Sequence, residues 1–145
     1  FNDVLEHIPD VAGTLAACHA HLNAGGHVIV NAPDRTGFLY RLSKAMARVG
    51  LSRSFDRMWQ VGFPSPHLHY FDTPNMQRLA RNAGFSVADT FALPTVSHDG
   101  LYSRVRYDKS VSAAKAGLLT AVLGALIPAL AILPADIRVW ILRKD

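Results

Sequence analysis

The sequence contains little cysteine and little charge. Its single cysteine, Cys18, has no second cysteine with which to form a disulfide or to share a zinc ion, so we expect a reducing compartment such as the cytoplasm. Only 18% of the residues are charged and 50% are hydrophobic, a composition that excludes an intrinsically disordered chain. The net charge of +4 permits an acidic partner, but it is too small to indicate nucleic-acid binding by itself.

What is present first is a short apolar run that ends in polar residues. Residues 1–9 place Asp3, Glu6 and His7 just before a proline. Such a pattern is typical of the carboxyl end of a buried strand, where open α/β sheets bind their ligands. A strand end with solvated charges is the alternative interpretation. Because the 145 residues open inside this strand, we expect them to be the carboxyl-terminal part of one domain.

The next segment has the pattern of a helix followed by a second strand. A helix is predicted from Pro9 and Asp10 to residue 22, since apolar residues recur there every three or four positions. The paired Gly25 and Gly26 end it, and the β-branched run at residues 27–32 predicts a buried strand. This strand and the opening strand would be parallel, so their polar ends, Asp3 to His7 and Asn31 to Asp34, would line one crevice.

Residues 35–57 are basic, and they carry six arginines and lysines against the single Asp56. A helix is predicted here, with one apolar face and one basic face. The apolar face comprises Phe38, Leu42, Ala45, Met46 and Val49, and the basic face comprises Arg41, Lys44 and Arg48. The basic face is either simply solvated or in contact with an anionic membrane or substrate.

Further along, residues 59–70 are aromatic and interrupted by prolines, and they include His67 and His69. We expect a loop that crosses the mouth of the crevice. A helix capped by Thr73 and closed by Gly84 follows, then a strand at residues 85–91 and a region at residues 93–108 that is mostly loop.

The composition then changes sharply, because residues 116–135 carry no charge. About 20 helical residues span roughly 30 Å, the thickness of a bilayer core. Pro128 interrupts the run and Pro134 ends it. Helices packed on the domain, an interfacial membrane contact and a transmembrane span are therefore all open alternatives. Residues 137–144 predict a last strand.

Four motifs together resemble the carboxyl-terminal half of class I S-adenosylmethionine-dependent methyltransferases. They are Asp-Val-Leu-Glu-His-Ile-Pro-Asp at residues 3–10, Leu-Asn-Ala-Gly-Gly at 22–26, Asn-Ala-Pro at 31–33, and His-Leu-His-Tyr-Phe at 67–71 followed by a helix and Ala-Gly-Phe at 83–85. The resemblance covers residues 1–92. Ala24 stands where the family usually has proline, but both glycines of that turn remain.

The resemblance implies an α/β, Rossmann-like fold formed by the later strands of a seven-stranded sheet, with an apolar helical insertion near the carboxyl terminus. We expect residues 1–92 to form sheet and helices, 93–135 a variable loop and apolar helical segment, and 136–145 the last strand. The missing half would hold most of the S-adenosylmethionine site, so the chain should be inactive alone. By the same resemblance Asn2, with Phe1 and Asp3 beside it, would contact the methionine portion of the cofactor.

The resemblance also suggests catalytic residues. His7 is the candidate base, with Glu6 beside it, although a histidine at this position can simply bind neighbouring backbone. Two subgroups, the ubiquinone-pathway O-methyltransferases and the small-RNA 2′-O-methyltransferases, use a similar motif to bind a divalent metal. Their ligands would correspond to Asp3, Glu6 and His7, completed by His67 or His69. Such oxygen and histidine ligands suit Mg²⁺ or Mn²⁺.

We therefore expect O- or N-methylation of a small or lipid-linked acceptor, with peripheral membrane contact as an open alternative. The first rival is an RNA methyltransferase, although no stacking platform for bases is evident and nucleic acid is not the expected partner. The second rival is a non-catalytic, membrane-associated scaffold with this fold. The sequence does not predict the oligomeric state.

Overall fold

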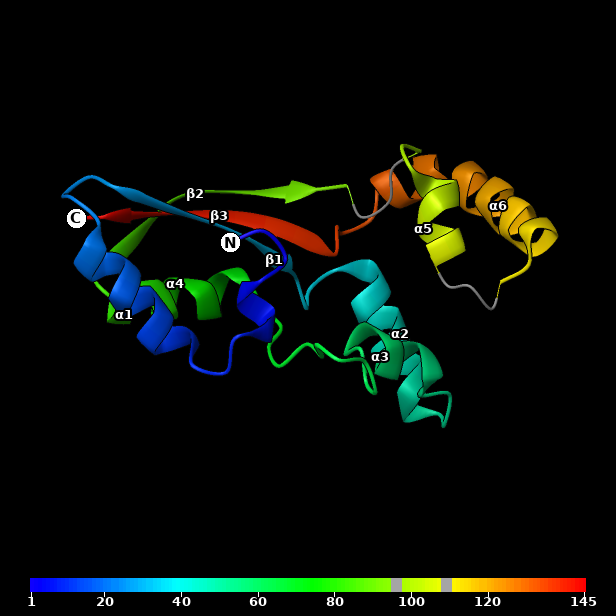
Figure 1. The fold of residues 1–145 in the computed structure, drawn as a ribbon, viewed down its shortest axis with the longest axis horizontal. Coiled ribbons are helices and arrows are strands. Elements are labelled where there is room, and N and C mark those ends of the chain that lie inside the picture. The colour runs from blue at the N-terminus through cyan, green and yellow to red at the C-terminus, as the bar shows by residue number, and fades with distance from the viewer. Residues whose placement is uncertain (95–97, 108–110) are drawn as a thin grey trace.

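The computed structural model describes residues 1–94, 98–107 and 111–145. Its centre is a sheet of the strands β1 (His27–Pro33), β2 (Phe85–Leu93) and β3 (Ile137–Lys144), in the order β1-β3-β2. β3 runs antiparallel to both neighbours and lies between them (Figure 1). All three strands were predicted, and the last residues of the chain thus hold the sheet together.

Residues 1–3 continue the sheet on the other side of β1. Asn2 forms a parallel bridge with Asn31, and the Asp3 amide donates to the Asn31 carbonyl at 3.0 Å. The parallel arrangement of the first and second segments is therefore as expected. The opening strand is, however, shorter than its apolar run predicts. Asp3 has a positive φ of 52°, which turns the chain into the 3-10 helix η1 (Leu5–His7).

One face of the sheet is covered by α1 (Val11–His21) and α4 (Thr73–Asn82), which lie side by side below it in Figure 1. Leu15 of α1 and Met76 of α4 are fully buried against the sheet residues Val30 and Trp140. Each such side chain contributes roughly 1.5–3 kcal/mol of hydrophobic stabilisation. Leu5 joins this core, so the turn that carries Glu6 and His7 is anchored at its first residue.

Both covering helices begin at an aspartate. Asp10 accepts a hydrogen bond from the Gly13 amide at 2.8 Å, as expected for a residue at the positive end of a helix. In α4 the capping residue is Asp72 rather than the predicted Thr73, because Asp72 and Asn75 form a reciprocal capping box. These caps fix where residues 3–10 and 59–72 enter the helices, and therefore where the candidate site lies.

The basic segment forms α2 (Phe38–Arg48) and the short α3 (Arg53–Met58). The predicted apolar face of α2 is not the buried one: Tyr40 and Ser43 are buried, whereas Leu42 and Val49 are 44% and 76% exposed. The reason is that Asp136 accepts hydrogen bonds from the Leu39 and Tyr40 amides and so fixes the first turn with Tyr40 inward. Apolar and basic side chains consequently share the outer surface of α2.

Between β2 and β3 the chain leaves the sheet as two helices, α5 (Leu101–Tyr107) and α6 (Ala113–Ala131), which stand beyond the end of the sheet in Figure 1. The region expected to be mostly loop therefore contains a helix; residues 95–97 and 108 of that region lie outside the described residues. α6 continues through Pro128 to Ala131, so a single helix carries most of the uncharged run. Leu101 and Ala116 are the buried anchors of this pair.

Candidate functional site

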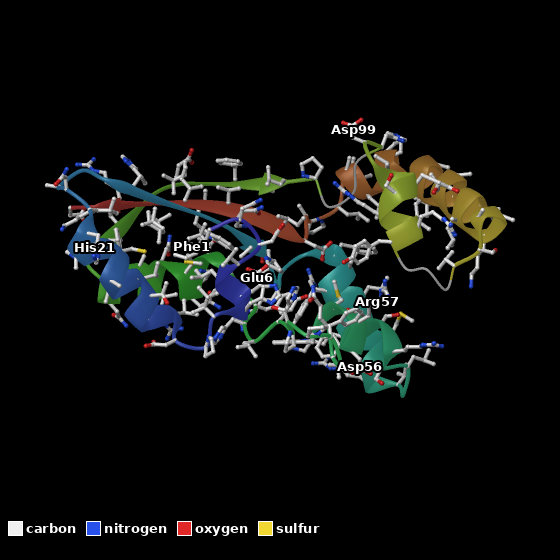
Figure 2. All side chains as sticks on the ribbon, viewed as in Figure 1. Phe1, Glu6, His21, Asp56, Arg57 and Asp99 are labelled. Atoms are coloured by element: carbon white, nitrogen blue, oxygen red, sulfur yellow. The ribbon has the colours of Figure 1, made fainter. Side chains whose placement is uncertain are left out.

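The candidate site is built around Glu6, in the turn between the parallel bridge and α1. Its side chain is 1% exposed, and its Oε2 atom has no hydrogen-bond partner among the described residues. Burial raises the pKa of this carboxyl group above its ordinary value, and the nearby Asp3 adds to the rise. Figure 2 shows Glu6 where the end of the sheet meets α2. A buried carboxylate oxygen without a partner is typical of a binding site rather than of a packed core.

His7 lies next to Glu6 with a fixed ring. Its Nδ1 is 2.9 Å from the Pro66 carbonyl oxygen and 3.2 Å from the Ser65 hydroxyl oxygen. Because a carbonyl oxygen can only accept, the bond to Pro66 assigns a proton to Nδ1. The other nitrogen, Nε2, then carries the lone pair and lies 4.0 Å from Glu6 Oε1. His7 is thus oriented to take up a proton or to bind a cation on the side of Glu6.

The predicted loop at residues 59–70 does cross over this turn. The main-chain carbonyl of Glu6 accepts two hydrogen bonds from it, from the Leu68 amide at 2.7 Å and the His69 amide at 3.1 Å. The His67 amide in turn donates to the Trp59 carbonyl at 3.1 Å, which closes the loop on itself. The loop therefore holds the Glu6 backbone in place and leaves its side chain free for a ligand.

This loop brings His67 to Glu6 and His7. The rings of His7 and His67 meet edge to face with centroids 4.7 Å apart. Burial lowers the pKa of His67 below its ordinary value, and the neighbouring His7 lowers it further. His67 is also near Gln60, whose Nε2 lies 3.0 Å from its Nε2, and near the Tyr70 hydroxyl, 3.3 Å from its Nδ1. At neutral pH His67 is therefore uncharged, the form that binds metals.

Ligand atoms of Glu6, His7 and His67 lie within 4.8 Å of one another. Two other predicted ligands are not part of this group among the described residues. Asp3 is exposed one turn earlier, and His69 directs its Nε2 to the Ile8 carbonyl at 3.0 Å. One carboxylate and two imidazoles fit a divalent transition metal such as Mn²⁺ better than Mg²⁺, which prefers oxygen ligands. The partnerless Glu6 Oε2 is consistent with such an ion.

A second buried oxygen without a partner lies where the cofactor would be expected. The Asn31 side chain donates to Asn2 Oδ1, while its own Oδ1 is buried and has no partner in the described part of the chain. Asn2 and Asp3 are exposed at this edge, and Phe1 is half-buried against the core. An amide oxygen and strand-end carbonyls can accept hydrogen bonds from an ammonium group, so these residues fit the methionine portion of S-adenosylmethionine.

An aromatic cluster forms the wall of the site behind His67. Tyr40, Phe55, Trp59 and Tyr70 stack in sequence, with adjacent ring centroids 4.6–6.3 Å apart. Tyr70 donates its hydroxyl to the Met58 carbonyl at 2.8 Å, and burial raises its pKa well above the ordinary value, so it remains protonated. The aromatic composition of residues 59–70 indicated a loop near the site. The contribution of Tyr40 and Phe55 to this aromatic wall was not predicted.

A hollow of about 440 Å³ adjoins the site through His69 and Tyr70. It continues between the start of α1 and the length of α4, where Asp10 and Arg78 line it. Neither Glu6 nor His7 lines this hollow, so the reactive group of a ligand bound there would have to reach across the loop. The chemical centre of the site is therefore the Glu6 turn, and the hollow is at most an adjoining space.

Comparison with known proteins identifies the family and the fold. A family profile described as a methyltransferase domain matches residues 1–90. No curated protein shows significant sequence similarity to the chain. Among solved structures, the chain is similar to a candidate sarcosine dimethylglycine methyltransferase from Galdieria sulphuraria, with 15% identity and a TM-score of 0.52. It is also similar to the mycolic acid cyclopropane synthase CmaA1 complexed with SAH and CTAB, with 19% identity and a TM-score of 0.55.

Both alignments include 99% of this chain but only 51% and 53% of the two solved chains, so the chain spans about half the length of these proteins. At such low identity the likeness shows the fold. The profile match covers more than half of the 145 residues and includes the Glu6 turn, β1, the loop and most of β2. The chain belongs to the family of class I S-adenosylmethionine-dependent methyltransferase domains.

Proposed function

We propose that this chain is the acceptor side of an enzyme that transfers the methyl group of S-adenosylmethionine to a hydroxyl or amine of a small or lipid-linked acceptor. The single observation that carries the proposal is the buried Glu6 carboxylate with an oxygen that lacks a partner, placed beside an oriented His7 and at the edge that holds Asn2. The cofactor supplies an electrophilic methyl group. The protein has to align the acceptor and remove its proton.

His7 is the proposed base. Its Nδ1 proton is held by the Pro66 carbonyl, so Nε2 is the atom that would receive the proton of the acceptor. Glu6 lies 4.0 Å from Nε2 and would stabilise the imidazolium that forms. The cofactor residues in this proposal are Asn2, with Phe1 and Asp3 beside it, and Asn31 is added to them because its buried Oδ1 has no partner.

A divalent metal is the finer alternative for the same group. Glu6, His7 and His67 are the residues that would hold Mg²⁺ or Mn²⁺. Such an ion lowers the pKa of an acceptor hydroxyl that binds to it. Titration of the full-length protein with Mn²⁺ should then give a dissociation constant that Glu6→Gln weakens at least tenfold. Activity that is indifferent to a chelator would remove the metal from the proposal.

A lipid-linked acceptor is preferred to RNA because of what surrounds the site. The groove that holds the basic residues of α2 is lined mainly by aliphatic side chains such as Leu42, and Phe38 alone does not make a platform on which successive bases could stack. One of the solved structures to which the chain is similar is a mycolic acid cyclopropane synthase. RNA therefore remains the rival acceptor, and a scaffold that binds no cofactor remains the rival function.

The decisive experiment uses the full-length protein. Calorimetry should detect S-adenosylmethionine binding, and a methyl-transfer assay on hydroxylated lipids should give an activity that His7→Gln reduces at least tenfold while cofactor binding persists. His21→Gln is the matched control, because His21 is at the far end of α1 and its Nδ1 bonds only to the Ala17 carbonyl. Absence of cofactor binding would favour the scaffold, and methylation of RNA but not lipid would replace the acceptor class.

A further inference from the structure

We propose that α6 and the outer surface of α2 together form a docking surface for an anionic lipid bilayer. This inference concerns surfaces outside the Glu6 turn. It does not depend on the proposed chemistry, since a scaffold could use the same surface.

The exposure of α6 is the first observation. α6 is long and apolar enough to cross a membrane, with a mean hydropathy of 1.8 over 18 residues, yet only 6% of that window is buried. Leu118, Val122 and Leu126 follow one another at intervals of four residues and are 66%, 48% and 47% exposed. A soluble protein rarely leaves so large an apolar stripe in water. The opposite side of the helix is partly covered by α5, so α6 is well suited to lie along a lipid surface on its open side.

The charged side chains within α5 and α6 are all positive, and Asp99 lies just before α5. Arg104 and Arg106 are on α5, and Lys115 is in the first turn of α6. The exposed Tyr102 and Tyr107 lie on the same short helix, and tyrosine is enriched where protein meets the lipid headgroups. An apolar helix flanked by cations and tyrosines matches an anionic membrane.

The basic surface of α2 is continuous with the carboxyl end of α6. Arg41, Lys44 and Arg48 line a groove of about 560 Å³ with Phe38, Leu42 and Ala45, and Pro134 closes it. The Phe38 amide donates to the Pro134 carbonyl at 2.8 Å, which ties the start of α2 to the segment that leaves α6. Figure 1 shows both helices toward the same end of the molecule.

Pro134 also lines a larger, mainly apolar groove of about 750 Å³. Its walls are the last turn of α6, with Ile127 and Leu130, and the end of β2, with Leu93. Arg138 is at its polar side and pairs with Asp34 at 2.6 Å. An acyl chain would fit the apolar wall while its headgroup stayed near the basic residues of α2. The two grooves and the α6 stripe therefore form one surface, which we call the lipid-facing surface.

Two other occupants fit this surface less well. A second copy of the chain, related by two-fold symmetry, would bring these basic residues close to their own counterparts, and like charges repel. The upstream half of the methyltransferase domain would extend the sheet next to residues 1–3, and β1 and β3 separate that edge from β2 and its exit to α5. A negatively charged bilayer supplies both the apolar and the ionic complement.

The test is co-sedimentation of the full-length protein with phosphatidylcholine vesicles, with and without phosphatidylglycerol. Wild-type protein should bind the anionic vesicles more tightly, and added salt should weaken this binding. The variant L118E/V122E should weaken binding at least tenfold, because two charged side chains would have to leave water. Val61→Glu is the control: it places the same charge on a valine that is 65% exposed but lies outside the lipid-facing surface.

A second variant separates the ionic part of the surface. R41Q/K44Q/R48Q should reduce the preference for anionic vesicles and leave the binding to neutral ones unchanged, because the cations of α5 and α6 remain. Circular dichroism should first establish that each variant is folded. Absence of vesicle binding by the wild type, or equal binding by L118E/V122E, would overturn the proposal. Concentration-dependent dimerisation lost in L118E/V122E, without vesicle binding, would assign the surface to a second copy instead.

Discussion

The helices α1 and α6 differ in where their apolar side chains go. Val11 and Leu15 of α1 are buried beneath the sheet, whereas Leu118 and Val122 of α6 face outward. α1 belongs to the sheet unit, by which we mean residues 1–93 and 136–145. α6 belongs to the helical segment that connects β2 to β3. An apolar sequence therefore shows that a helix needs a cover, but the surrounding fold decides whether that cover is protein.

The largest effect should come from emptying the core of the sheet unit. Trp140 of β3 is fully buried, and its ring packs against that of Phe71. Trp140→Ala should therefore lower the free energy of unfolding by about 4 kcal/mol. Leu118→Ala on α6 should change it by less than about 0.5 kcal/mol, since the side chain is already exposed. Urea denaturation of both variants checks the pair. Equal losses of unfolding free energy in the two variants would mean that α6 is covered in solution. That result would contradict the proposed difference between α1 and α6.

The next effect concerns the chemistry of the sheet unit. His7→Gln should lower kcat by about a hundredfold, which is the smaller end of what a lost general base removes. Its KM should change little if His7 acts in the transition state rather than in binding. Steady-state kinetics of the full-length enzyme, with His21→Gln as the control, measure this. A change confined to KM would make His7 a binding residue only.

A smaller loss of stability is expected at Asp136, where the helical segment joins β3. The Asp136 carboxylate accepts bonds from the Leu39 and Tyr40 amides, at 3.2 and 2.8 Å, and so satisfies the first turn of α2. Asp136→Ala should therefore destabilise the fold by about 1–2 kcal/mol, as the loss of a helix cap does. It should also raise amide hydrogen exchange in α2 but not in α1. Uniform exchange throughout the sheet unit would contradict this local role.

The smallest effect is a gain of stability. Burial raises the pKa of Glu6 above its ordinary value of 4.5, so folding favours its protonated form. The stability that protonated Glu6 contributes is fully present below pH 4.5. It is lost as the pH rises through the pKa that Glu6 has in the folded protein. Without divalent cations, Glu6→Gln should therefore be about 1 kcal/mol more stable than wild type at neutral pH. Thermal melts should show this gap closing toward pH 4; a gap that widens on acidification would contradict the sign.

Most of the sheet unit could be predicted from its sequence. The strands β1, β2 and β3 and the helices α1 and α4 have clear periodic patterns, glycine turns and capping residues. The early end of the first strand could not be predicted, because it depends on the positive φ of Asp3 rather than on hydrophobicity. The inward side of α2 was also missed, since Asp136, almost a hundred residues later, decides it.

The candidate site was predicted less completely. Glu6, His7 and His67 are brought together, whereas Asp3 and His69 lie outside their group. Sequence spacing shows which residues share a turn, but it does not determine which of two histidines in a loop turns inward. The two hydrogen bonds from Leu68 and His69 to the Glu6 carbonyl settle that, and backbone bonds of this kind leave no trace in residue types.

Those two bonds have a consequence for how such a site can diversify. They use the main-chain carbonyl of Glu6, which every amino acid offers in the same way. The side chain at position 6 can therefore be exchanged during evolution without detaching the loop, and the loop can acquire new side chains without moving the turn. The turn at position 6 and the loop over it can in this way change independently.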